Sequence, residues 1–390
     1  MSIYTALSTD DIVRAYPTVV TTGLWSSDTG SLTSELYIDT QNQIPFSKEY
    51  YFDVYNLSPS ESAANAEVQF SIAYGHINGG GSPGLAENQT STLSSKAIYS
   101  QYRNLLLDPS DTKFTFNGVE SDHIYVINIQ RARMREQLDP GNWELPLSGA
   151  NGIRTYIDNS GEARLSSTLT STTKAGRAYA IISGALDGSA GSVTSSTAYS
   201  GSGYGIVYPD LGIIVLNPTA ICPDVGFFNN TSGTTTGPNT VALSTPYYSS
   251  SIFSANKITS TRPMAPTTHS AGITYGVEKS AFNHAGLFIS LNLATKTGKA
   301  FKARSAETIS STHYFVRLRN KSYNYSNNPT FYNPDNGSLL YADFKNNPKV
   351  YITTVGLYNN QNELLAVAKL SKPVPKSFDE EVLLRVRLDF

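Results

Sequence analysis

The chain has 390 residues, of which 15% are charged, and its formal net charge at pH 7 is −2. A charge so close to balance creates no field that would favour nucleic acid or an acidic membrane as a partner. Polarity comes from Ser, Thr, Asn and 29 Gly, while 25 Tyr outnumber 16 Phe. This composition favours an all-β protein with long uncharged loops over a helical enzyme or a disordered chain.

The single cysteine, Cys222, excludes a disulfide within the chain. Its place in an apolar stretch before Pro223 favours a small buried side chain over a nucleophile. Residues 1–8 show neither the basic nor the apolar segment of a signal peptide. No stretch approaches the roughly 18 consecutive apolar residues of a membrane span. We therefore expect a product made in the cytoplasm, with no membrane partner.

The first 150 residues combine several strand patterns with one clear helix. Residues 8–16 predict a short helix that Pro17 ends, within an N-terminal arm of residues 1–30. Residues 92–107 predict the best helix, because they carry an apolar stripe and Asp108 and Pro109 follow them. Strands are predicted at residues 34–38, 50–56, 66–74, 113–116 and 123–133.

The character of the sequence changes near residue 150. Residues 160–205 and 229–272 are rich in Ser, Thr and Gly, and strand patterns resume strongly at residue 313. We predict a mainly β fold with one or two short helices. Its parts are an antiparallel β-sandwich core (residues 31–149 and 300–390) and an inserted loop-rich β domain (residues 150–299).

The C-terminal forty residues carry the clearest pattern. Residues 350–358 and 363–370 indicate two strands joined by a turn. Residues 371–377 indicate a connection, because Pro373 and Pro375 cannot donate ladder hydrogen bonds. Period-two alternation then predicts a half-buried final strand. In it Val382, Leu384, Val386, Leu388 and Phe390 alternate with Leu383, Arg385, Arg387 and Asp389.

The sequence shows no motif of an active site. None of the five histidines has a His, Cys or paired carboxylate at the spacing of a metal site. There is no Gly-x-Ser-x-Gly elbow and no phosphate-binding loop, and Asp379, Glu380 and Glu381 indicate a solvated turn. We expect no enzyme, no metal and no cofactor. Carboxylate pairs that cleave glycosides converge in space, so a glycan-acting protein stays open as an alternative.

Basic residues recur at spacing two in three places. On extended strands each set would share one face, and on a common sheet they would form a basic ladder that docks an acidic neighbouring subunit. The alternative is that each arginine pairs with a local acid, such as Glu136, Asp139 or Asp389. The residues of this expected partner-docking face are Arg131, Arg133, Arg135, Arg317, Arg319, Lys321, Arg385 and Arg387.

Three stretches resemble structural proteins of contractile-tailed bacteriophages, in particular myophages of the cyanophage type. The first is residues 96–107 (KAIYSQYRNLLL), continued at 113–116, 123–127 and 139–145 (DPGNWEL). The second is residues 205–217 (GIVYPDLGIIVLN). The third is similar to the β-rich end of baseplate wedge and fibre-attachment proteins, and comprises residues 323–329 (YNYSNNP), 351–358 (YITTVGLY) and 363–373 (ELLAVAKLSKP).

The resemblance implies a virion structural protein, made in the host cytoplasm, that is a baseplate or tail subunit. It would form homo-oligomers, contact other tail or baseplate subunits, and use no catalytic residue and no nucleic acid. A neck, fibre or capsid-decoration protein is the structural alternative. The alternative of another class is a glycan-binding or depolymerising tail-spike module, in which Tyr side chains and Trp143 would stack on sugars.

Overall fold

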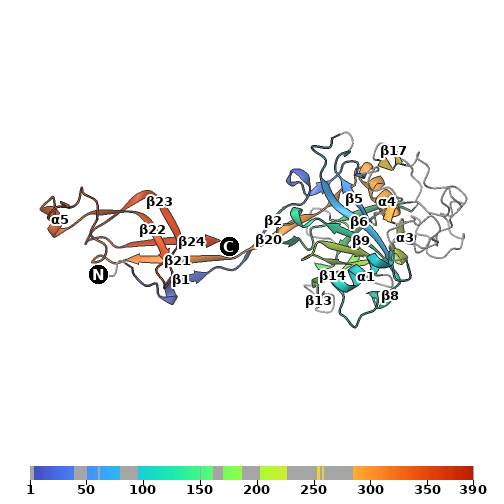
Figure 1. Ribbon diagram of the computed structural model, residues 1–390, viewed down its shortest axis with the longest axis horizontal. Coiled ribbons are helices and arrows are strands. Elements are labelled where there is room, and N and C mark those ends of the chain that lie inside the picture. Colours follow the sequence, from blue (N-terminus) through green and yellow to red (C-terminus); the bar gives the residue numbers. More distant parts are fainter. Residues whose placement is uncertain are drawn as a thin grey trace, which may run out of the picture. The chain divides into compact units, whose positions relative to one another are not determined.

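The computed structural model is mainly β, with antiparallel sheets and few, short helices (Figure 1). This confirms the predicted fold class. The structure describes residues 4–38, 51–59, 62–79, 95–149, 151–160, 170–186, 203–225, 253–254, 257–258 and 284–389.

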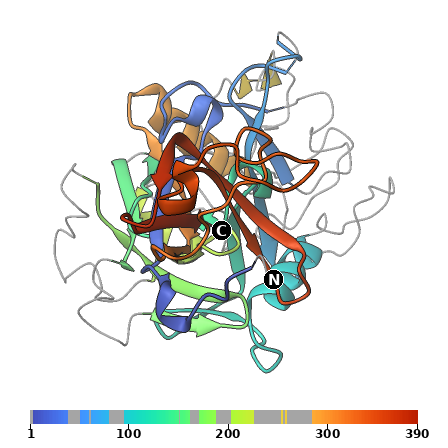
Figure 2. The same ribbon diagram turned by 90° about the vertical axis from the view of Figure 1, so that its left-hand side faces the viewer.

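The chain forms two compact units, and both of its ends belong to the smaller one (Figures 1 and 2). The smaller unit consists of Met1–Val19 and Thr308–Phe390, and the larger unit is Val20–Glu307. The expected division was different, with residues 150–299 as an insertion into a core made of 31–149 and 300–390. Strand pairing within the larger unit explains the difference, because residues 145–216 complete the same sheet as residues 37–129.

A ten-stranded antiparallel sheet organises the larger unit. One half contains β4 (Tyr37–Ile38), β5 (Tyr51–Tyr55), β6 (Val68–His76) and β9 (His123–Ile129). The other contains β11 (Leu145–Gly149), β12 (Gly152–Asp158), β13 (Thr170–Thr173), β14 (Gly176–Ser183), β15 (Gly205–Tyr208) and β16 (Ile213–Leu216). The two halves join where β16 pairs with β9, from Ile213 opposite Asn128 to Leu216 opposite Tyr125.

Both faces of this sheet are covered, so its central strands are apolar on both sides. Alternating residues of β9 supply the two faces: Tyr125 and Ile127 belong to one core cluster, Ile124 and Val126 to the other. The first face packs against α3 (Pro218–Val225) and α4 (His284–Lys296). The second face packs against α1 (Ser95–Leu106) and against the hairpin formed by β7 (Phe114–Phe116) and β8 (Val119–Ser121).

The predicted helix at 92–107 is thus confirmed as α1, whereas α4 lies in the region expected to be loop-rich β. Helix α4 buries Leu287, Phe288, Leu291 and Ala294 against the sheet. An apolar pattern at i, i+4 and i+7 signals this helix, but it follows a long Ser- and Thr-rich stretch.

Short elements complete the larger unit, although β2 and β20 each have two residues that belong to the smaller unit. They are β2 (Thr18–Gly23), η2 (Ser26–Asp28), β3 (Ser31–Leu32), η3 (Arg131–Arg133), β10 (Gln137–Leu138), β17 (Phe253–Ser254), β18 (Lys257–Ile258), β19 (Phe301–Lys302) and β20 (Arg304–Ile309). Strands β10, β20 and β2 form a second sheet, and β19 pairs with β3.

The smaller unit packs a three-stranded sheet against a long hairpin. The sheet contains β1 (Ile12–Arg14), β21 (Ser311–Leu318) and β24 (Val382–Asp389), and the hairpin is β22 (Val350–Tyr358) with β23 (Leu364–Lys376). Helix α5 (Asp343–Asn346) precedes β22. Leu318, Val382 and Leu384 form the core against Ile352, Val355, Leu370 and Val374 of the hairpin.

The alternation predicted for the last strand is confirmed, since Val382, Leu384 and Val386 are buried and the residues between them are exposed. Phe390 lies outside the described residues.

Two local predictions were wrong. Residues 8–16 do not form a helix: η1 (Thr9–Asp11) is a single turn, and β1 follows it, pairing Val13 with His313. β-branched Ile12 and Val13 favour the strand. Residues 371–377 are not a connection either, because β23 continues through Pro373 and Pro375 to Lys376. Strand β23 pairs only with β22 among the described strands, and a strand with a free edge tolerates proline.

Candidate functional site

A row of polar side chains crosses three strands on one face of the large sheet. Asp53 of β5 lies opposite Ser71 of β6, and Ser71 lies opposite Asn128 of β9. Directly opposed residues of antiparallel strands point to the same side of a sheet. The next positions on this side, Ala73 and Val126, are apolar and buried. The polar row therefore marks where the apolar face ends.

Helix α1 comes close to this face at Gly75. A Cβ atom there would lie 2.7 Å from the backbone nitrogen of Tyr99, so only glycine lets the helix come so near. Ser71 lies four residues before Gly75 on the same strand. At that distance from this close contact, a groove opens between α1 and the sheet.

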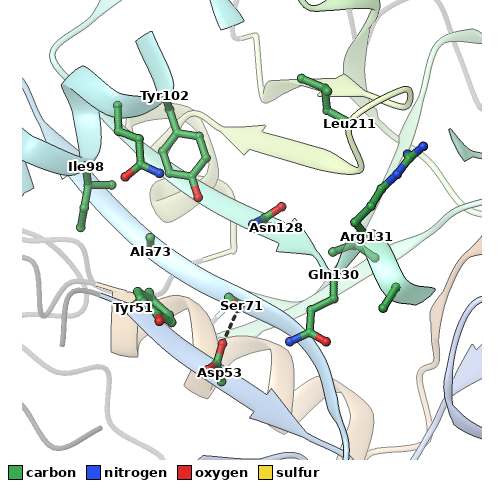
Figure 3. Close-up of a pocket in the computed structure, with 13 residues that line it drawn as sticks. Tyr51, Asp53, Ser71, Ala73, Ile98, Tyr102, Asn128, Gln130, Arg131 and Leu211 are labelled. Atoms are coloured by element: carbon green, nitrogen blue, oxygen red, sulfur yellow. Dashed lines mark hydrogen bonds between the residues drawn. The ribbon is translucent and has the colours of Figure 1, made fainter. Parts of the chain in front are cut away.

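The groove has a volume of about 720 Å³, within the range of small-molecule sites (Figure 3). Its floor comes from β5, β6 and β9, one side comes from Ile98, Gln101 and Tyr102 of α1, and the other side comes from residues 130–132 and Leu211. Tyr51 and Tyr102 supply two aromatic rings.

The two charged groups at the groove are already engaged by the protein. The Ser71 hydroxyl donates a hydrogen bond to Oδ1 of Asp53, drawn as a dashed line in Figure 3. Nη1 of Arg131 donates to the backbone oxygens of Glu136 and Asp210, at 2.6 and 3.3 Å. These contacts hold the carboxylate and the guanidinium in place.

Four other polar side chains of the groove, which are uncharged, are by contrast not engaged by described residues. Within the described part of the chain, the side chains of Gln101, Tyr102, Asn128 and Gln130 have no hydrogen-bonding partner. Burial, reinforced by neighbouring Tyr51, raises the pKa of Tyr102 to about 12. Tyr102 is therefore neutral at physiological pH and keeps its hydroxyl proton as a donor. The groove offers amide and hydroxyl groups ready for a ligand.

Three of the expected docking arginines lie in the larger unit, and they do not form a ladder on a strand. Arg131 and Arg133 belong to the 3-10 helix η3, and Arg135 lies in a bend after it. Arg133 forms an ion pair with Glu67 at 2.9 Å, and Arg135 forms one with Glu307 at 3.0 Å. Arg133 and Arg135 thus pair with acids that are distant in the sequence, whereas the alternative named local acids such as Glu136 and Asp139.

The other five lie in the smaller unit, where three share a face. In register, Phe315 lies opposite Arg385, Arg317 opposite Leu383, and His313 opposite Arg387. Because Val382, Leu384 and Val386 point inward, Arg317, Arg385 and Arg387 lie on the outer face of the sheet.

The five expected docking residues in this unit differ in their partners. Arg387 forms an ion pair with Asp389 at 2.6 Å, whereas Arg317 and Arg385 have no acidic partner among the described residues. Arg319 and Lys321 follow the end of β21 and are exposed.

Exposed large hydrophobic side chains gather in the smaller unit. Among the described residues, the larger unit has four of them: Tyr51, Leu57, Leu105 and Val119. The smaller unit contains Tyr4, Ile12, Val13, Tyr16, Val19, Tyr323, Tyr325, Leu340, Tyr341, Tyr351, Tyr358, Leu364, Leu365, Val367, Phe378 and Leu383. On the hairpin, Tyr351 is 65% exposed and Leu365 is 68% exposed.

Several side chains singled out in the sequence belong to the core. Trp143 is 1% exposed, so it does not stack on a sugar as the glycan alternative expected. Cys222 is a buried free cysteine, as predicted. His123 is buried between Tyr74 and Thr219, and His269 lies outside the described residues.

Neither a metal cluster nor a membrane helix is found in the described residues. No group of three or more His, Cys, Asp or Glu side chains among them is arranged to hold a metal ion. None of their helices combines the length and the apolar character that a membrane crossing requires.

Comparison with known proteins yields no match to a protein-family model, to a curated protein or to a solved structure. Function must therefore be argued from the two surfaces described above: the polar groove of the larger unit and the apolar, basic surface of the smaller unit.

Sequence reasoning did not find the groove. Asp53, Ser71 and Asn128 are far apart in the chain, and only cross-strand register brings them together. The available signal was a polar residue within each of three largely apolar strand patterns.

Proposed function

We propose that this chain is a virion structural protein, a baseplate or tail subunit of a contractile-tailed phage that acts through protein–protein interfaces. Other copies of the chain and neighbouring tail subunits are its partners, and neither nucleic acid nor a membrane is. The resemblance of three sequence stretches to such proteins supports this proposal. The observation that carries it is the concentration of exposed apolar side chains in the smaller unit.

Contiguous exposed apolar surface is characteristic of interaction sites. The hairpin of β22 and β23 buries only Val350 and Lys376, so most of its residues stay accessible. Tyrosine is common among the exposed side chains, and interfaces are enriched in tyrosine because its ring can be buried while its hydroxyl stays hydrated.

The outer face of β21 and β24 adds a basic component. Exposed Arg317 lies beside exposed Leu383, and Arg385 lies beside half-buried Phe315. Arginine next to apolar side chains suits a neighbour that presents carboxylates around an apolar contact. A subunit with acidic residues at its interface fits this face.

Light scattering of the full chain, across concentration and at low and high salt, tests the proposal. We expect a discrete multimer or larger assemblies whose mass falls with salt, because salt screens the arginine contacts. The double variant Leu365→Glu, Val367→Glu should weaken association by about 100-fold or more, since each apolar side chain contributes about 1.5–3 kcal/mol when buried.

The double variant Thr353→Glu, Thr354→Glu is the matched control, because it places the same two charges on the same hairpin at residues that are already polar and exposed. It should assemble like the wild type. A wild-type chain that stays monomeric at every concentration and salt would contradict the proposal.

A further inference from the structure

We propose that the groove between α1 and strands β5, β6 and β9 binds a short stretch of a neutral glycan. This inference rests on the groove alone and does not depend on the proposed structural role. The site lies wholly in the larger unit, away in sequence from the apolar and basic residues of the smaller unit.

The polar groups of the groove match sugar hydroxyls. Asn128, Gln101 and Gln130 each offer an amide oxygen that accepts and an NH₂ that donates, and Tyr102 offers a hydroxyl. A sugar ring carries adjacent hydroxyls that both donate and accept, so each amide can engage it at two points. These four side chains have no hydrogen-bonding partner within the described residues, so binding breaks no hydrogen bond between these side chains and another described residue.

The aromatic rings supply the second element of sugar recognition. Tyr102 is 8% exposed and forms part of the side of the groove, and Tyr51 is 39% exposed at its edge (Figure 3). One face of a pyranose is made largely of C–H groups, which pack against an aromatic ring. Tyr51 is available for this contact because much of its ring is not covered by protein.

Charge at the groove favours a neutral ligand. The Asp53 carboxylate, which accepts from Ser71, would repel an anion, and Nη1 of Arg131 is bound by two backbone carbonyls. An anionic ligand would need free cationic donors, and Figure 3 shows the Arg131 guanidinium directed away from Asp53 and Asn128.

The groove is suited to binding and not to cleavage. Glycoside hydrolysis typically uses two carboxyl groups that flank the scissile bond. Asp53 is the single carboxylate among the described lining residues. The proposal is therefore a glycan-binding site.

An array of neutral oligosaccharides built from glucose, galactose, mannose, rhamnose and N-acetylhexosamines tests this with the full chain. We expect binding to one or a few structures, followed by titration calorimetry with the best of them. Gln130→Ala removes an exposed amide without touching the core, and should weaken binding at least tenfold. Tyr51→Ala removes the exposed ring and should weaken binding by a similar factor.

Gln361→Ala is the matched control, because it removes the same amide group from an exposed turn of the smaller unit. It should bind like the wild type. Failure of the wild type to bind any neutral oligosaccharide would overturn the proposal. So would binding that survives both Gln130→Ala and Tyr51→Ala, or a preference for sulfated or nucleotide probes included on the same array.

Discussion

His123 occupies a site that favours the neutral imidazole. Its Nδ1 lies 3.1 Å from the Tyr74 hydroxyl and its Nε2 lies 2.8 Å from the hydroxyl of Thr219. Burial lowers the pKa of His123 to about 4, the neighbouring His76 acts in the same direction, and Asp122 opposes them. Two hydroxyl partners satisfy a neutral ring, whereas a charged ring at this depth would be poorly solvated.

This environment predicts loss of stability in mild acid. With a pKa of about 4 in the folded state and about 6.5 in the unfolded state, the unfolded chain alone binds the proton between these values. The free energy of unfolding therefore falls as pH drops from 6.5 to 4, by about 3 kcal/mol at most.

Urea unfolding followed by tryptophan fluorescence measures this loss in the larger unit, because Trp25 and Trp143 are both buried there. His123→Gln keeps hydrogen-bonding groups but does not titrate, so its stability should change less over this range. Parallel pH profiles for the wild type and the variant would contradict the prediction.

At the scale of elements, the approach of α1 to β6 sets the width of the groove. Gly75→Ala would place a Cβ atom 2.7 Å from the backbone nitrogen of Tyr99 and 2.9 Å from its Cα. Backbone atoms cannot move aside as a side chain can, so the helix must shift. We expect a loss of about 1–3 kcal/mol in the free energy of unfolding, typical of overpacking.

Chemical denaturation measures this loss, with Gly30→Ala as the control. A Cβ atom at Gly30 would come no closer than 3.5 Å to the Arg304 side chain, an ordinary contact. The helix shift should also weaken glycan binding, since Gln101 and Tyr102 belong to α1. Equal stability of the two variants would show that the helix accommodates the methyl group without cost.

An element could be predicted from the sequence where its pattern is local, and could not where it depends on a distant partner. The last strand was predictable because burial of Val382, Leu384 and Val386 against exposed Leu383 and Arg385 is a local alternation. The division of the chain into units was not predictable, because it depends on the pairing of β16 with β9, which are separated in the sequence by several strands and loops.

The burial of a single side chain can likewise depend on partners that are distant in the sequence. Lys376 is fully buried, and its ammonium donates to the backbone oxygens of Asn320 and Ser377 and to Oδ1 of Asn324, each at 2.9 Å. No sequence pattern indicates these partners, because two of them lie more than fifty residues earlier in the chain. The burial of a lysine is acceptable here because three acceptors replace its water.

At the scale of the whole molecule, the two units differ in what they expose. The larger unit has a continuous sequence and extensive core clusters, and it presents a polar groove. The smaller unit assembles from both ends of the chain around a small core and presents apolar and basic side chains. The two proposals place ligand binding in the first unit and assembly in the second.

This assignment predicts that the larger unit folds and functions alone. A fragment of residues 18–309 keeps β2 and β20 whole together with every strand of the ten-stranded sheet. We expect it to unfold with the same tryptophan fluorescence transition as the full chain, because both tryptophans lie in its core. It should retain the glycan binding proposed for the groove and remain monomeric where the full chain assembles. A fragment that assembles like the full chain would place the interface in the larger unit, and one that fails to fold would show that the smaller unit supports it.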